Sequence, residues 1–121
     1  MEILVVGLNY RTAPVEIRER IDFSRYPSEQ YLRRLGQSPS VKSGTVLSTC
    51  NRVEIYVTGV DLNPLMKDTS EFLAGFHGLK PEQVAECLYT KANKQAVTHL
   101  FRVASSLDSM VLGGAADPGA G

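Results

Sequence analysis

The chain has 121 residues, which is enough for one compact domain but not for two independent ones. With 43% hydrophobic and 21% charged residues, its composition is that of an ordinary globular domain and not of a disordered, fibrous or membrane chain. Thirteen basic residues balance thirteen acidic ones, so no global positive field exists to drive non-specific nucleic-acid binding, and any RNA contact must be local or lie elsewhere.

The N-terminal residues 1–8 are apolar but too short for a signal peptide, and they lack a basic leader and a cleavage site. No apolar stretch approaches the roughly 20 residues that cross a bilayer. We therefore expect a cytoplasmic protein without membrane attachment. In that compartment Cys50 and Cys87 are expected to be free thiols and not a disulfide.

The first third of the chain predicts one strand and two short helices. Residues 2–8 are rich in Ile and Val and end at a polar step, which is typical of a central strand. Pro14 favours a helix that starts around residues 12–14, because proline is tolerated in a first turn. Pro27 opens a second helix, which we expect to run to Leu35.

The middle of the chain predicts a hairpin followed by a helix. Residues 44–48 and 53–59 are two runs rich in β-branched side chains, and the polar segment 49–52 separates them, as in two adjacent strands joined by a tight loop. Apolar residues then keep helical spacing over residues 63–76 until Gly78.

The last third predicts a short helix from residues 80–82, a strand at residues 87–89 and a helix from Asn93, as its N-cap, to about residue 107. The resulting order is strand, helix, strand, strand, helix, strand. This order predicts an α+β fold with a ferredoxin-like antiparallel sheet (βαββαβ), helices on one face and an extra C-terminal helix.

Cys50 is the first candidate for chemistry. It lies in the predicted hairpin loop, with Arg52 two positions on and Glu54 four positions on. A thiol reacts as the thiolate, and a nearby cation stabilises that form. The alternative is that Cys50 is a small core residue, which is a common fate of a cytosolic cysteine. Cys87 has apolar neighbours, and we expect it to serve packing.

His99 is the second candidate. At about 100° per residue it falls beside the apolar face of its predicted helix, where a side chain can reach into a cleft. The alternative is an ordinary boundary histidine. Two cysteines and two histidines at scattered positions predict no metal site, and the sequence has neither a P-loop nor a Gly-x-Gly-x-x-Gly after a strand for a dinucleotide.

Three blocks of the sequence strongly resemble the glutamyl-tRNA reductase family, in order and at the expected spacing. They are GLNYRTAPV at residues 7–15, STCNRVEIY at residues 48–56 and HLFRVASSLDSMVLG at residues 99–113. The resemblance covers residues 1–113, which correspond to the family's N-terminal catalytic domain. Full family members continue into a nucleotide-binding domain and a long helical dimerisation domain.

The resemblance implies an NADPH-dependent reduction of glutamyl-tRNA(Glu) to glutamate-1-semialdehyde for tetrapyrrole (porphyrin) synthesis. Carried over by position, Cys50 forms a thioester with the glutamyl group and His99 assists near the ester. The residues that match those holding the glutamyl moiety are Thr49, Asn51, Arg52 and Ser109. The cofactor NADPH and the homodimer contacts would belong to domains absent from this chain. Glutamate-1-semialdehyde aminomutase is a further implied partner.

The last residues, 114–121, depart from the family, which continues Glu-Pro-Gln-Ile-Leu-Gly-Gln-Val where this chain has Gly-Ala-Ala-Asp-Pro-Gly-Ala-Gly. Inserting one G ahead of a suitable coding sequence for the family residues yields all eight residues of this chain. We therefore expect a non-native or frameshifted tail, and an unshifted reading frame in the encoding DNA would contradict this. Ser106 also departs, since the family usually has Gly there.

From these residues we expect at most Cys50-dependent hydrolysis of glutamyl-tRNA, without NADPH oxidation. Two rival interpretations remain. In the first, the chain is a ferredoxin-like binding or interaction module with an inert cysteine. In the second, the fragment folds but has no activity.

Overall fold

The computed structural model describes residues 1–111 of the chain. Four strands form its sheet: β1 (Glu2–Asn9), β2 (Ser43–Ser48), β3 (Arg52–Gly59) and β4 (Tyr89–Ala92). The α-helices are α1 (Val15–Arg20), α2 (Ser28–Gly36), α3 (Leu62–Gly75) and α4 (Lys94–Val111), and two 3₁₀ turns, η1 (Pro81–Gln83) and η2 (Ala85–Cys87), precede β4. No helix in this part of the chain is both long enough and apolar enough to cross a membrane.

The strands lie in the order β2-β3-β1-β4, and every neighbouring pair is antiparallel. β1 is therefore an inner strand, with β3 on one side and β4 on the other. This order and the element sequence confirm the predicted α+β, ferredoxin-like fold. The β2–β3 hairpin forms as the two β-branched runs predict, with Ser48 opposite Val53 at its closed end.

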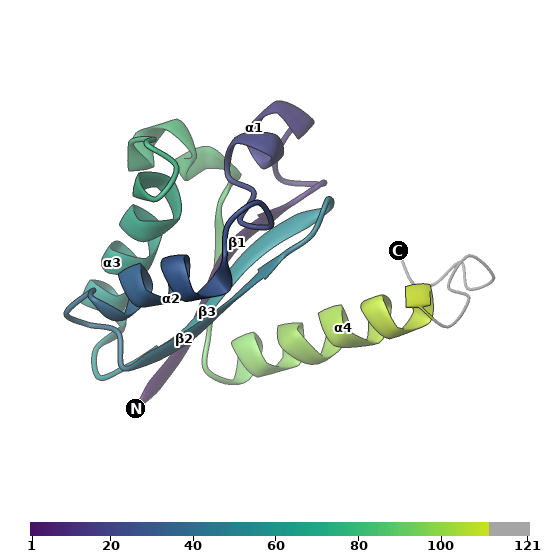
Figure 1. Ribbon diagram of the computed structural model, residues 1–121. Helices are drawn as coiled ribbons and strands as arrows, with labels where there is room; N and C mark the ends of the chain where they lie inside the picture. The colour runs from purple at the N-terminus through teal and green to yellow at the C-terminus, as the bar shows by residue number, and fades with distance from the viewer. Residues whose placement is uncertain (112–121) are drawn as a thin grey trace.

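Alternation along the strands sends side chains to two different layers. Leu4, Val6 and Leu8 of β1 enter the main core, which α2 and α3 cover on one face of the sheet. Phe23, between α1 and α2, is fully buried there and stacks on Phe72 of α3. Figure 1 shows α2 and α3 on this side.

The extra C-terminal helix α4 covers the opposite face of the sheet (Figure 1). Its Ala96 is buried against Val5 and Tyr56, whose side chains point away from the main core. Asn93, directly before α4, has a positive φ of 53° and accepts a hydrogen bond from the Ile3 amide at 2.9 Å. This bond fixes the start of α4 to β1, so the second layer is held at the sheet.

The predicted strand at residues 87–89 is wrong by two positions. The Cys87 amide donates to the Val84 carbonyl at 2.9 Å, which closes a 3₁₀ turn, and the strand begins only at Tyr89. β4 then pairs with Leu4–Gly7 of β1. The other predicted elements are confirmed to within a few residues at their ends.

Candidate functional site

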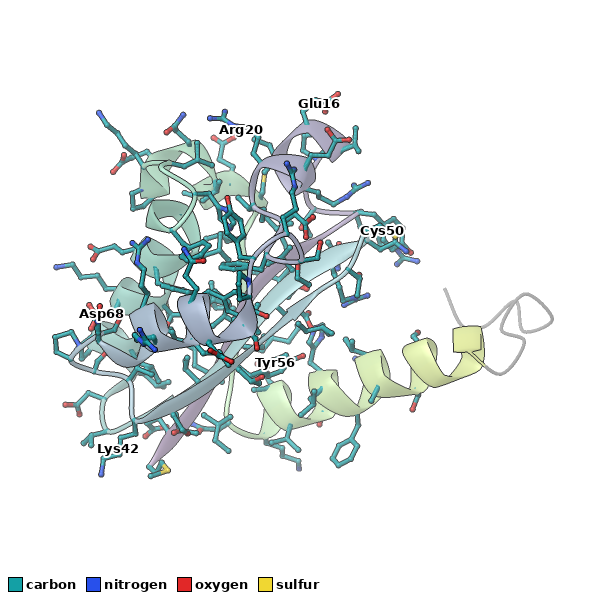
Figure 2. The ribbon with its side chains drawn as sticks, in the orientation of Figure 1. Glu16, Arg20, Lys42, Cys50, Tyr56 and Asp68 are labelled. Atoms are coloured by element: carbon teal, nitrogen blue, oxygen red, sulfur yellow. The ribbon has the colours of Figure 1, made fainter. Side chains whose placement is uncertain are left out.

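Cys50 lies at the closed end of the β2–β3 hairpin, exposed to solvent (Figure 2). The Thr49 amide donates to the Arg52 carbonyl at 2.8 Å, and the Thr49 hydroxyl accepts from the amides of Asn51 and Arg52 at 3.2 Å each. Thr49 thus shapes the turn that presents the thiol. Asn51 is exposed beside Cys50 on the same turn.

A second set of bonds holds this end of the hairpin to the rest of the domain. The Ser48 hydroxyl donates to Asp22 at 2.9 Å and accepts from the Phe23 amide at 3.0 Å. Burial by itself raises the pKa of Asp22, but hydrogen bonds from Ser24 and Ser48 and the charge of Arg25 outweigh it and hold that pKa below its usual range. Asp22 therefore stays ionised and anchors the strand end two residues before the thiol.

Glu54 is a fully buried carboxylate at the centre of a polar network. Its side chain accepts from the hydroxyls of Tyr56 at 2.7 Å and of Tyr89, from Arg52 at 3.3 Å and from Nε2 of His99. These partners come from β3, β4 and α4. Because a buried carboxylate is costly unless it is paired, the four donors account for its position inside the domain.

Gly7 makes this network possible. In the sheet it lies between Glu54 of β3 and Tyr89 of β4, opposite both. A Cβ atom at Gly7 would lie 2.7 Å from the Val53 carbonyl oxygen and 2.8 Å from Cγ of Glu54, closer than such atoms approach. The Glu54 side chain thus occupies the space that any larger residue would fill, and it reaches across β1 to Tyr89.

The network keeps Glu54 charged. Burial opposes ionisation, but the hydrogen bonds from Tyr89, His99 and Tyr56 outweigh it and lower the pKa of Glu54. Burial and the neighbouring carboxylate raise the pKa of Tyr56 and of Tyr89, so both phenols keep their protons and donate. With Nε2 of His99 held by this carboxylate, Nδ1 is the ring nitrogen that can exchange a proton with a bound molecule.

A hollow of about 230 Å³ opens above the network. Arg52 and His99 form part of its wall, and the other polar residues that line it are Asn9, Tyr10, Arg11, Arg102 and Ser106. Only 17% of the Arg52 side chain and 14% of the His99 side chain are exposed, so both are held in place rather than free in solvent. A cationic hollow of this size suits a small carboxylate-bearing group.

The structure brings some of the predicted site residues together and separates others. Arg52 and His99 meet at Glu54 and at the hollow, whereas Cys50 and Asn51 lie on the turn that leads into Arg52. No hydrogen bond joins Cys50 to His99 within the described part of the chain. Ser109 falls in α4, but the structure describes only its backbone and not its side chain. Residues 114–121 lie outside the described residues.

The described residues do not fit a dinucleotide. A nicotinamide cofactor is usually bound by a parallel sheet with a glycine-rich turn at a helix N-terminus, whereas this sheet is antiparallel throughout. Within residues 1–106 there is also no group of three or more His, Cys, Asp or Glu side chains that could hold a metal ion.

Sequence reasoning noted Glu54 only as a carboxylate near Cys50 and missed its role as the hub of the network. It also missed Gly7, Tyr56 and Tyr89. One signal was available: Val53, Ile55 and Val57 alternate with Glu54 and Tyr56, so these two had to face the layer opposite the main core. The contacts with Tyr89 and His99, 35 and 45 residues away, leave no local trace in the sequence.

The fold and the site together define a ferredoxin-like α+β domain with an exposed thiol on a hairpin turn and a histidine–carboxylate network under the same hairpin. Comparison with known proteins identifies the family within this class. Residues 6–116 match the family described as "Glutamyl-tRNAGlu reductase, N-terminal domain". The chain therefore belongs to this family, which confirms the resemblance seen in the three sequence blocks.

Individual relatives agree with the family match. The chain is 50% identical over 113 residues to glutamyl-tRNA reductase of Brevibacillus brevis and 49% identical to that of Magnetococcus marinus, in each case over 93% of this chain. Its structure resembles that of glutamyl-tRNA reductase from Methanopyrus kandleri with a TM-score of 0.58 and 31% identity, over 89% of this chain and 23% of the other. The chain spans about a quarter of the length of the curated relatives it matches.

Proposed function

We propose that this domain carries out the acyl-transfer half of glutamyl-tRNA reduction. The Cys50 thiolate attacks the carbonyl carbon of the ester between glutamate and the tRNA, a carbon–sulfur bond forms and the bond to the ribose oxygen breaks. The tRNA leaves with a free hydroxyl and the glutamyl group stays on Cys50 as a thioester. The observation that carries this proposal is the Glu54–His99 pair at the wall of a cationic hollow in a member of this family.

His99 supplies the proton that the leaving ribose oxygen requires. Glu54 holds Nε2, so the ring is fixed in orientation and presents Nδ1 as the nitrogen that gives the proton to the leaving oxygen. His99 is the proposed catalytic acid, and Glu54 is a positioning residue that acts through it.

Arg52 binds the side-chain carboxylate of the glutamyl group in this proposal. Within the described residues its guanidinium makes one hydrogen bond, from Nη1 to Glu54, so the other guanidinium donors remain for a ligand. Such a fork matches the two oxygens of a carboxylate. Thr49 contributes by holding the turn, and Asn51 and Ser109 are proposed to contact the same glutamyl group.

The rest of the reaction belongs to the whole protein. We propose that full-length relatives reduce the thioester with NADPH to glutamate-1-semialdehyde for tetrapyrrole synthesis, as cytoplasmic homodimers that deliver the product to an aminomutase. The described residues do not fit NADPH, so the hydride transfer is proposed to take place outside them. In this chain, water releases glutamate from the thioester. The resemblance implies that the family's Glu and Gln near the substrate are replaced here by Gly114 and Ala116, and we expect weaker substrate binding as a result.

Release of glutamate from glutamyl-tRNA tests the proposal. Wild type should hydrolyse the ester faster than buffer, and Cys50→Ala should abolish the excess, whereas the matched control Cys87→Ala should keep it. NADPH absorbance should not change. If Cys50→Ala released glutamate as fast as wild type, Cys50 would not be the nucleophile.

Thiol labelling distinguishes the proposal from an inert binding module. Cys50 is exposed and Cys87 half-buried, so a comparison of the two thiols alone would report their exposure. Iodoacetamide alkylation of Cys50 should therefore be compared with that of the cysteine in an unstructured peptide of residues 48–54, STCNRVE, at the same neutral pH. We expect Cys50 to react faster than this fully accessible thiol. An equal or slower rate would favour the inert module.

A further inference from the structure

A second hollow, of about 300 Å³, lies next to the first. Its lining consists of Lys91, Lys94, Gln95, Thr98, His99 and Arg102. His99 and Arg102 line both hollows, so the proposed catalytic histidine stands in the wall that they share. A molecule bound across this wall would place one part in each hollow and its central bond beside His99.

The second hollow is positively charged for reasons of local geometry. Lys94, Thr98 and Arg102 follow one another at intervals of four residues on α4 and therefore share a face of the helix. Lys91 points to the same face of β4 as Tyr89, two residues earlier, and thus toward α4.

Within the described residues, the three cations Lys91, Lys94 and Arg102 are not paired with acidic side chains. In that part of the chain, no acidic side chain lines either hollow. Because the whole chain has a net charge of zero, this is a local concentration of positive charge, as an RNA contact on this domain would require.

We propose that the second hollow binds the backbone phosphates of the 3′-terminal nucleotides of the substrate, while the first hollow holds the glutamyl group. This inference rests on the proposed function. In an aminoacyl-tRNA the ester joins the amino acid to the terminal ribose, and the first phosphate follows on the far side of that ribose. With the ester at His99, Lys91 and Lys94 meet phosphate, and Gln95 and Thr98 offer neutral hydrogen bonds to phosphate or ribose.

Two small substrates test this assignment. One is the glutamyl ester of adenosine, which has the ester and the ribose but no phosphate. The other is the glutamyl ester of the trinucleotide CCA, which adds the backbone phosphates. We expect the double variant Lys91→Ala/Lys94→Ala to lower the rate of Cys50 acylation by the CCA ester about tenfold, because each exposed charge contact contributes up to roughly fivefold. Acylation by the adenosine ester should not change.

Salt provides a second readout on the same variants. The wild-type rate with the CCA ester should fall as salt rises, and the double variant should flatten this dependence, because part of it comes from the phosphate contacts that the variant loses. Lys42→Ala/Lys67→Ala is the matched control, because it removes the same charge from exposed positions away from the hollow. Lys42 precedes β2, at the end of the hairpin opposite Cys50 (Figure 2). Lys91→Arg/Lys94→Arg should retain most of the wild-type rate.

The outcomes separate this inference from the proposed function. A selective loss on the CCA ester supports the phosphate site. The phosphate site is overturned, and the proposed function stands, if wild type acylates Cys50 but the double variant keeps the wild-type acylation rate with the CCA ester. The same holds if its rate falls equally with both esters or only as far as that of the Lys42/Lys67 control. If neither ester acylates Cys50 in the wild type, the proposed function fails and the phosphate site fails with it.

Discussion

Substitution of Gly7 by alanine tests the structural basis of the site. The added Cβ would lie 2.7 Å from the Val53 carbonyl oxygen and 2.8 Å from Cγ of Glu54. The first of these neighbours is backbone of the adjoining strand, and the second belongs to a fully buried side chain with four donors. Neither can give way freely, so β1 and β3 must separate or Glu54 must leave its position.

The size of the effect follows from two opposing contributions. Overpacking in a well-packed interior costs about 1–3 kcal/mol. Replacing glycine by alanine also restricts the unfolded chain, which offsets about 0.4–1 kcal/mol. We therefore expect Gly7→Ala to lower the free energy of unfolding by about 1–2 kcal/mol, or the melting temperature by roughly 4–8 °C for a domain of this size. Acylation of Cys50 should slow as well, because Glu54 would no longer hold His99.

The control for this experiment is Gly75→Ala at the end of α3. No atom lies within 4 Å of a Cβ at that position, so the same substitution meets no clash. Alanine should stabilise the helix there by about 0.5–1 kcal/mol. Urea unfolding followed by circular dichroism measures both variants. If Gly7→Ala were as stable as wild type, or if Gly75→Ala were equally destabilised, the close packing of Glu54 over Gly7 would be refuted.

Three further predictions concern the same network and its support. Glu54→Gln should cost about 3 kcal/mol, because it removes the charge that Arg52 and His99 face in a buried site; Glu71→Gln on the exposed face of α3 should leave the urea midpoint unchanged. The pKa of Glu54 is lower in the folded chain than its unfolded value of 4.5, so its carboxylate stabilises the fold at neutral pH and loses that contribution as the pH falls. Between about pH 5 and pH 3, wild type should therefore lose more stability than Glu54→Gln in a pH series of melting curves. Equal losses would contradict this. Ser48→Ala should cost about 1 kcal/mol and slow Cys50 acylation without reducing binding of the substrate, and an unchanged rate would show that the bond to Asp22 does not position the turn.

Local patterns in the sequence predicted most of the fold. The β2–β3 hairpin followed from two runs of β-branched residues around a polar loop, and the position of α3 followed from its apolar spacing. The strand at residues 87–89 was misplaced because Cys87, Leu88 and Tyr89 look alike in hydrophobicity, while a single backbone hydrogen bond to Val84 decides where the turn ends. Such a bond depends on geometry that hydrophobicity does not encode.

The site was predictable only in part. Cys50 and Arg52 stood out because they share one polar loop, and His99 because of its place on the helix. The hub of the network, Glu54, depends on strand order: β1 must lie between β3 and β4 before Gly7 can separate Glu54 from Tyr89. The packing of α4 against the sheet then places His99 beside the Glu54 carboxylate. These are consequences of tertiary packing and not of any local pattern.

The most direct test of the account is to trap the acyl group on the protein. The chain is mixed with glutamyl-tRNA, quenched in acid, digested and analysed by mass spectrometry. We predict a glutamyl thioester on the peptide that contains Cys50, absent from Cys50→Ala, retained in Cys87→Ala and reduced in His99→Gln. No adduct on Cys50 under conditions in which the wild type releases glutamate, or an adduct on Cys87 instead, would contradict the proposal that Cys50 is the nucleophile.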